Sequence, residues 1–401
     1  MSSNGLVEED GLRGVTSNPT IFDKAISGST DYDMALRALL AADPQAPVGN
    51  LYEALAIEDI QMTADVLRPV YDATHGDDGY VSFEVSPRLA HDTERTINEA
   101  KRLRAAVDRP NVMIKVPATP AGIPAIEELI AEGVSVNVTL MFSMSHYEAV
   151  ARAYIKGLER CGDPGQVASV ASFFVSRVDT MVDKALEETG NPEAKALREK
   201  SPSPIRRSFT GAFRDFHGEG FAALRQRGAR VQRPLWASTG TKNPAYSDVL
   251  YVENLIGSET VNTLPPETLN AFRDHGKVPG ATVKQELAEA DEVLARLANL
   301  RHRSQRHYRK AAARWCCRFC RVLRSIDGRS RKSASRCSAR TWIDWSFTSA
   351  LTKARSIAVW HNGKRTNSRA GCGKRLHDLV QGAAARVDRS PRLVGITGDD
   401  G

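Results

Sequence analysis

Short apolar runs with the composition of β-strands alternate with longer helical patterns along most of this 401-residue chain. Alternation of this kind is typical of parallel βαβ units, in which a helix lies between consecutive strands. The seven expected strands span about 253 residues, close to the roughly 250 residues of a (β/α)8 barrel. The strands are Leu12–Ser17, Tyr80–Val85, Asn111–Val116, Val134–Leu140, Val167–Phe174, Pro234–Ser238 and Thr260–Leu264, and the clearest helices are Tyr52–Thr74, His91–Val107, Ile123–Glu132, Met144–Leu158 and Ser176–Thr189.

A closed barrel of this kind needs an eighth strand, whereas only seven are visible in the sequence. The missing strand should precede Leu12, but the residues there include the acidic run Glu8, Glu9 and Asp10 and have no strand pattern. We therefore expect an α/β fold of the TIM (β/α)8 barrel class that lacks its first strand.

Charge divides the chain near Leu300. Residues 1–300 contain 31 Lys and Arg against 42 Asp and Glu, whereas residues 301–401 contain 24 against six, none of them Glu. Five of the six cysteines and four of the five tryptophans also lie in the second part. We expect a barrel domain over residues 1–300 and a basic tail rich in Arg, Ser, Cys and Trp over residues 301–401.

The composition of the first part excludes several classes of protein. It has one cysteine, Cys161, so a disulfide framework cannot form within it. The N-terminus lacks the apolar segment of a signal peptide, and no run approaches the roughly 18 apolar residues of a membrane span. We expect a cytoplasmic protein with no membrane contact, and no oligomeric state follows from these features.

Most of the expected strands carry a polar side chain at or near their C-terminal end. Side chains alternate between the faces of a strand, so Glu84, Lys115 and Thr139 lie on the face opposite to their apolar neighbours. A barrel interior is normally filled by branched apolar side chains, and catalytic groups lie at the C-terminal ends of its strands. The shared placement therefore predicts a functional site. The polar residues concerned are Thr16, Asn18, Ser82, Glu84, Lys115, Asn137, Thr139, Ser172 and Ser238.

Lys115 indicates the chemistry of this site, because it lies between Ile114 and Val116 in an apolar strand. Burial disfavours the charged form of an amine, and a neutral amine is a nucleophile that forms an imine with a carbonyl. With Glu84 and Thr139 to handle protons, the set favours carbonyl chemistry through a lysine imine. A lysine that ends a strand and reaches solvent is the alternative for Lys115 taken alone.

Six sequence strings around these residues resemble the transaldolase family, and most closely its bacterial branch, which includes fusions with glucose-6-phosphate isomerase. The resemblance covers about residues 5–300. It implies a (β/α)8 barrel enzyme of the pentose phosphate pathway that needs no cofactor or metal. The strings are Gly-Val-Thr-Ser-Asn-Pro-Thr-Ile-Phe (14–22), Val-Ser-Phe-Glu-Val (81–85), Met-Ile-Lys-Val-Pro-Ala-Thr (113–119), Val-Asn-Val-Thr-Leu-Met-Phe-Ser (136–143), Ala-Ser-Phe-Phe-Val-Ser-Arg-Val-Asp (171–179) and Leu-Trp-Ala-Ser-Thr-Gly-Thr-Lys-Asn-Pro (235–244).

The resemblance also implies roles for individual residues. Lys115 would form a Schiff base with the ketose donor, while Glu84 and Thr139 would hold a water that shuttles protons. Lys242 stands where other branches carry arginine, which binds phosphate with two donors, whereas lysine offers a point charge. The substrate contacts implied in this way are Asn18 and Asn137 for the dihydroxyacetone unit, and Ser172, Arg177, Ser238 and Lys242 for the sugar and its phosphate.

Three features depart from the family pattern. The family takes a catalytic aspartate from its first strand, which is the strand missing here. Asp10 lies beside Leu12–Ser17, which corresponds to the second strand of the family, so it does not match that aspartate. Residues 201–216 contain two prolines and several serines where relatives have an alanine-rich helix, and the resemblance stops near Leu300. A reading-frame shift in a GC-rich gene would produce both this block and a tail of this composition.

Besides a frame shift, the tail has three further interpretations: a disordered segment, a nucleic-acid binder and a zinc site. Its charge is typical of nucleic-acid binding, and a cysteine cluster with nearby histidines suggests zinc. Cys337 and Cys372 do not form a second closely spaced pair, so we expect neither a zinc site nor a nucleic-acid partner. The candidate zinc ligands are Cys316, Cys317, Cys320, His302 and His307.

The expected function is transfer of a dihydroxyacetone unit from sedoheptulose 7-phosphate to glyceraldehyde 3-phosphate, giving erythrose 4-phosphate and fructose 6-phosphate. One alternative is a Schiff-base aldolase that releases free dihydroxyacetone. Others are a fragment of a bifunctional transaldolase and glucose-6-phosphate isomerase, and a catalytically impaired remnant with a basic tail.

Overall fold

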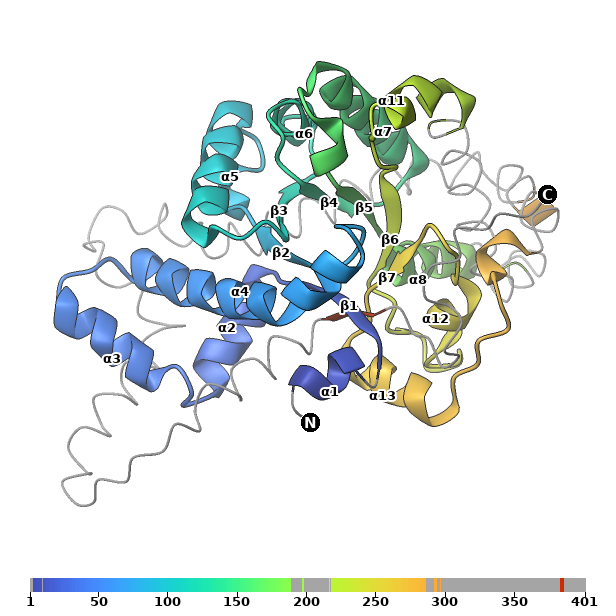
Figure 1. The fold of residues 1–401 in the computed structure, drawn as a ribbon. Coiled ribbons are helices and arrows are strands. Elements are labelled where there is room, and N and C mark those ends of the chain that lie inside the picture. Colours follow the sequence, from blue (N-terminus) through green and yellow to red (C-terminus); the bar gives the residue numbers. More distant parts are fainter. Residues whose placement is uncertain are drawn as a thin grey trace.

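Seven parallel β-strands form a curved sheet at the centre of the molecule (Figure 1). The computed structural model describes residues 3–8, 10–188, 197, 216, 218–285, 292, 293, 296 and 383–385. The seven strands pair in chain order, each parallel to the next. They are β1 Leu12–Thr16, β2 Tyr80–Glu84, β3 Val112–Pro117, β4 Val136–Met141, β5 Ser169–Phe174, β6 Arg233–Ala237 and β7 Val261–Asn262. The expected α/β barrel-type fold is confirmed, and strand boundaries shift by a few residues at most.

Helices connect the strands and lie around the outside of the sheet (Figure 1). They are α1 Ser3–Glu8, α2 Pro19–Gly28, α3 Asp33–Ala42, α4 Val48–Ala73, α5 Thr93–Val107, α6 Gly122–Ala131, α7 Met144–Arg160, α8 Val175–Glu187, α11 Ala222–Gln226, α12 Leu250–Asn254 and α13 Pro266–His275. Local sequence fixes several helix starts. Asn18, Asp92 and Ser143 each accept a hydrogen bond from a first-turn backbone N–H of α2, α5 and α7.

The two faces of the strands contact different parts of the molecule. Val81, Ile114 and Val138 are fully buried in the large apolar core that joins the sheet to the helices. Because side chains alternate along a strand, Lys115 lies on the opposite, inner face of β3. The inner faces meet in a second, smaller apolar cluster, several of whose members line one interior pocket. That cluster consists of Tyr80, Met113, Ala168, Val170, Leu235 and Ala237.

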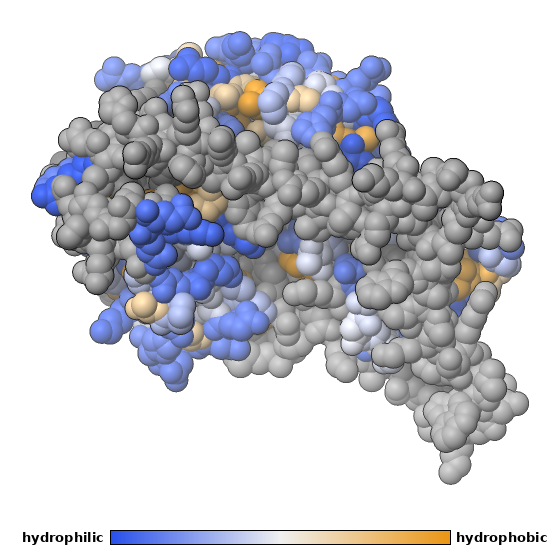
Figure 2. Space-filling view, turned by 180° about the vertical axis from the view of Figure 1, so that it is seen from behind, coloured by the Kyte–Doolittle hydropathy of each residue, from blue (hydrophilic) through white to orange (hydrophobic). Residues whose placement is uncertain are grey.

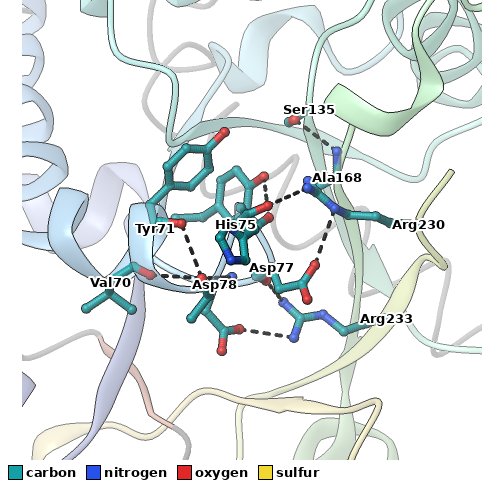
Figure 3. A network of polar contacts seen from close by, with 12 residues as sticks. Val70, Tyr71, His75, Asp77, Asp78, Ser135, Ala168, Arg230 and Arg233 are labelled. Atoms are coloured by element: carbon teal, nitrogen blue, oxygen red, sulfur yellow. Dashed lines mark hydrogen bonds and ion pairs between the residues drawn. The ribbon is translucent and has the colours of Figure 1, made fainter. Parts of the chain in front are cut away.

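Two arginines near the start of β6 hold the turn between α4 and β2 at the N-terminal end of the barrel (Figure 3). Arg233 Nη1 lies 3.0 Å from Asp78 Oδ1, and Arg230 Nη2 donates to the His75 carbonyl oxygen at 2.7 Å. Arg230 Nε also pairs with Asp77 Oδ1 at 3.3 Å. Three strands separate β2 from β6 in the sheet order, so these contacts require the sheet to curl.

At the edge where the sequence predicts a missing strand, β1 pairs with a short strand from the C-terminal part of the chain, β8 Ala383–Ala385. The pairing is antiparallel, with Val15 opposite Ala383 and Gly14 opposite Ala384. Three consecutive alanines have little β-propensity, so the sequence does not reveal this strand. The remainder of residues 301–401, including the cysteines and histidines named above, lies outside the described residues, as do residues 201–215.

The described surface is mainly hydrophilic on the face shown in Figure 2, with only small hydrophobic areas. Among large hydrophobic side chains of the described residues, Met34 is prominent because 77% of it is exposed. No helix in the described ranges has both the length and the apolar composition needed to cross a membrane.

Candidate active site

Lys115 lies near the C-terminal end of β3, and only 9% of its side chain is exposed. The parallel register places Glu84 of β2 on one side of it and Asn137 of β4 on the other. Lys115 Nζ is 3.2 Å from Glu84 Oε2, and the Glu84 side chain is only 5% exposed. The alternative in which Lys115 reaches solvent therefore does not hold for this structure. A buried charge needs a partner of opposite sign, and Glu84 supplies it.

Ser17, directly after β1, completes the surroundings of the amine. Its carbonyl oxygen accepts a hydrogen bond from Lys115 Nζ at 3.2 Å, and its own hydroxyl donates to the Ser82 carbonyl at 2.8 Å. Ser17 is not among the functional residues expected from the sequence. The group that contacts Lys115 is a backbone carbonyl, for which side-chain type carries no signal.

Asn137 forms the centre of a hydrogen-bonded row across three strands. Its Nδ2 donates to Ser82 Oγ at 2.9 Å, and its Oδ1 accepts from Ser172 Oγ at 2.7 Å. All three residues are buried. The row therefore fixes the orientation of the amide, while each hydroxyl oxygen keeps lone pairs for a ligand. Ser82 was expected on this polar face without an assigned role, and it lies two positions before Glu84 on the same face of β2.

Thr139 lies two residues after Asn137 on the same face of β4 and is 1% exposed. Its Oγ1 has no hydrogen-bond partner among the described residues. A buried hydroxyl without a partner has lost its contacts with water and gained nothing in return. The rest of the fold has to offset this cost. Thr139 is therefore a candidate for contact with a ligand or an ordered water.

Asn18 is the N-cap of α2, where its Oδ1 accepts a hydrogen bond from the Ile21 N–H at 3.0 Å. Pro19 follows at the first helical position, which is typical of a helix start. The capping bond uses the carbonyl side of the Asn18 amide. The amide nitrogen is thus the part of the side chain that remains for a substrate.

Three of the four residues expected to contact the sugar and its phosphate, Arg177, Ser238 and Lys242, follow the ends of β5 and β6. Ser238 directly follows β6, and its Oγ lies 3.1 Å from Ser176 Oγ at the start of α8. Burial lowers the pKa of Lys242 below its ordinary value, and the nearby positive charge of Arg177 lowers it further. Two cations close enough to affect each other form a site suited to an anion.

Asp10 does not take part in either group. It forms an ion pair with Arg273 of α13, in which Arg273 Nε donates to Asp10 Oδ1 at 2.8 Å. The described residues contain no group of three or more His, Cys, Asp and Glu side chains placed to hold a metal ion.

Comparison with known proteins places the chain in a family. The sequence model of the transaldolase/fructose-6-phosphate aldolase family matches residues 3–325. A transaldolase of Parafrankia sp. (strain EAN1pec) is 50% identical over 292 residues, which are 72% of this chain and 79% of that protein. Transaldolase 1 of Streptomyces avermitilis is 50% identical over 300 residues (74% and 79%), and a transaldolase of Thiobacillus denitrificans is 47% identical over 300 residues (74% and 83%). On this coverage, together with the inward-facing polar groups at the strand ends, the chain belongs to the transaldolase/fructose-6-phosphate aldolase family.

Proposed function

We propose that this chain is a transaldolase of the pentose phosphate pathway that acts in the cytoplasm on sugar phosphates. It would move a dihydroxyacetone unit from sedoheptulose 7-phosphate to glyceraldehyde 3-phosphate, giving erythrose 4-phosphate and fructose 6-phosphate. The observation that supports this most strongly is the buried pair of Lys115 and Glu84 on adjacent strands, in a member of this family.

In this proposal Lys115 is the nucleophile. Its neutral amine adds to the C2 carbonyl of the ketose phosphate, and loss of water gives an iminium ion. The iminium accepts the electron pair released when the C3–C4 bond breaks, so the aldose phosphate leaves and an enamine stays on Lys115. The enamine carbon then adds to the acceptor aldehyde, and water releases the new ketose phosphate from the lysine.

Glu84 and Thr139 handle the protons of these steps. Glu84 Oε2 is 3.2 Å from Lys115 Nζ, so the carboxylate can take a proton from the ammonium before attack. The Thr139 hydroxyl, which lacks a partner in the described part of the chain, is available to hold a water together with Glu84. That water takes the C4 hydroxyl proton as the bond breaks and returns a proton to the oxygen of the acceptor.

The remaining polar residues bind the sugar phosphate. Asn137 and Ser172 bind hydroxyl groups of the dihydroxyacetone unit beside Lys115, since their mutual hydrogen bond holds both in fixed orientations. The Asn18 amide nitrogen contributes a further donor. The phosphate binds at the second group, which consists of Arg177, Ser238 and Lys242.

A Schiff-base aldolase is the second candidate, because the family that matches this chain includes fructose-6-phosphate aldolases by its own description. Both reactions use the same lysine and the same bond cleavage. They differ in what happens to the enamine, which is protonated and released as free dihydroxyacetone in an aldolase but attacks an aldehyde in a transaldolase.

An assay with and without acceptor separates the two reactions. The protein is incubated with fructose 6-phosphate, and the products are measured with and without erythrose 4-phosphate. We expect sedoheptulose 7-phosphate and glyceraldehyde 3-phosphate only when the acceptor is present, and little free dihydroxyacetone without it. Acceptor-independent release of dihydroxyacetone would assign the aldolase reaction instead, and no product under either condition would contradict both.

A further inference from the structure

A fully buried hydroxyl at the start of α8 contacts a predicted phosphate-binding residue but has no role in the mechanism above. Ser176 is the second residue of α8 and is 0% exposed. Its Oγ lies 3.1 Å from Ser238 Oγ, beyond the end of β6. A buried serine is normally satisfied by the backbone, whereas this one meets another hydroxyl. The contact therefore links Ser238 to the residue directly before Arg177 in α8.

The backbone of Ser238 lies in an uncommon conformation. Its φ of +58° falls in the left-handed region, which serine adopts rarely and glycine readily. Backbone strain of this kind persists only where the surroundings impose it, and it is concentrated at ligand sites. The strained backbone and the Ser176 contact together fix where the Ser238 side chain lies.

A pair of hydroxyls can form its hydrogen bond in either direction, since each can donate or accept. A phosphate dianion can only accept hydrogen bonds. With phosphate bound, Ser238 therefore has to donate to a phosphate oxygen and accept from Ser176. A bound anion would therefore select one of the two possible directions.

Two cations lie in the same region of the fold. Arg177 directly follows Ser176 in α8, and its charge contributes to the lowered pKa of Lys242. The Lys242 ammonium is also only 3.6 Å from the position that a Cβ on Gly240 would occupy, so it folds back over the segment that follows Ser238. The hydroxyl pair and the two cations thus belong to the same two segments, the start of α8 and the residues that follow β6.

We propose that Ser176 is a positioning residue that orients the Ser238 hydroxyl toward the terminal phosphate of the substrate. This rests on the assignment of Ser238, Arg177 and Lys242 to the phosphate in the proposed function. Ser176 itself does not touch the substrate. Its hydroxyl donates to Ser238 Oγ, so the Ser238 proton is left to donate to the phosphate. Two hydrogen bonds in series polarise each other, which strengthens the bond from Ser238 to the phosphate.

The test measures the dissociation constant of inorganic phosphate, which does not depend on turnover. It uses the full chain and compares wild type, Ser176→Ala, Ser238→Ala and the double variant. We expect Ser176→Ala to weaken phosphate binding by about threefold to tenfold, typical of one hydrogen bond. The double variant should bind no more weakly than Ser238→Ala alone, because Ser176 acts only through Ser238.

Thr180→Ala is the matched control, since Thr180 also donates a hydrogen bond within the first turns of α8, to the Ser176 carbonyl at 2.6 Å. It should leave phosphate affinity unchanged. Unfolding curves of all variants separate loss of structure from loss of binding.

Three results would overturn the proposal: unchanged phosphate affinity in Ser176→Ala, additive effects in the double variant, or no phosphate binding by the wild type. None of these is the result that rejects the proposed function, which is absence of turnover with fructose 6-phosphate and erythrose 4-phosphate. With active protein, Ser176→Ala should raise KM for fructose 6-phosphate while leaving kcat nearly unchanged.

Discussion

The two ends of the barrel both contain charged side chains, but these side chains are held in different ways. At the N-terminal end, Arg230 and Arg233 reach across to the turn before β2 and bond its carboxylates and backbone carbonyls (Figure 3). At the C-terminal end, Lys115 has one carboxylate neighbour, and the Thr139 hydroxyl finds no partner among the described residues.

We infer from this difference that the charges at the N-terminal end stabilise the fold and that the polar groups at the C-terminal end are available for a substrate. A mutually bonded network gains stability from contacts that a ligand would only disturb. A buried hydroxyl without a hydrogen-bond partner lowers the stability of the fold. Among the described residues, the ion pair of Lys115 and Glu84 belongs to no larger network of ion pairs, so either side chain can contact a substrate during a reaction. We therefore expect substitutions at the C-terminal end to affect turnover and those at the N-terminal end to affect stability.

The largest effect is expected for Lys115→Met, which removes the proposed nucleophile and keeps an apolar stem of similar length. Turnover should fall by at least about 1,000-fold, as for removal of other covalent nucleophiles. The control is Lys101→Met, because Lys101 also pairs with a glutamate, Glu132, at 2.7 Å, but on an exposed surface. Steady-state kinetics should show full activity in the control. An equal loss of turnover in Lys115→Met and Lys101→Met would contradict the distinction between the buried and the exposed lysine.

Arg233→Ala should affect stability most. It leaves Asp78, whose side chain is 7% exposed, without the ion pair at 3.0 Å. Breaking a buried pair in this way should lower the free energy of unfolding by about 3 kcal/mol. Urea unfolding measures this change, and kcat per folded molecule should stay within about twofold of wild type. Asp77→Ala, at a side chain that is 69% exposed, should cost less than about 1 kcal/mol.

Thr139→Val tests the opposite combination. Valine has nearly the same shape, so stability should be unchanged or slightly higher, since no hydrogen bond seen in the described part is lost. The loss of the hydroxyl should reduce kcat by about 100-fold, the lower end of the effect of a group that assists proton transfer. The matched variant is Thr63→Val. The native Thr63 hydroxyl donates a hydrogen bond to the Asp59 carbonyl oxygen at 2.7 Å in α4. There we expect a cost of about 1 kcal/mol in unfolding and normal kcat.

The smallest effect concerns the pH dependence of phosphate binding. Burial and Arg177 lower the pKa of Lys242 from its ordinary 10.5, while the facing Glu267 raises it. Lys242 therefore loses its charge at a lower pH than an exposed lysine, and phosphate affinity should fall as the pH rises through that lowered pKa. Titration calorimetry from neutral to alkaline pH should show a decrease of about threefold. Lys242→Arg should remove this decrease, and an unchanged profile in that variant would contradict it.

Much of the fold could be predicted because its signals are local. Alternation of apolar and polar residues identified β2, β3 and β4 and placed Glu84, Lys115 and Asn137 on their inner face. Since neighbouring strands in βαβ units pair in parallel, proximity of these three side chains followed from their shared position at the strand ends.

The contacts that could not be predicted are distant in sequence or made by the backbone. Arg233 and Asp78 are 155 residues apart, and nothing near either residue indicates the other. The Ser176–Ser238 contact depends on the left-handed backbone of Ser238. A left-handed position is normally recognised in a sequence by a glycine, and here the residue is a serine. The Ser17 carbonyl at Lys115 has no sequence signature, and the pairing of Ala383–Ala385 with β1 comes from three residues of low β-propensity.

The most direct test of the account is borohydride trapping of the imine. The protein is incubated with fructose 6-phosphate, reduced with borohydride, digested, and examined by mass spectrometry. We predict a reduced three-carbon adduct on Lys115, which is absent from Lys115→Met and absent without sugar phosphate. An unlabelled Lys115 in protein that turns over, or a label on another lysine such as Lys242, would contradict the assignment of Lys115 as the nucleophile.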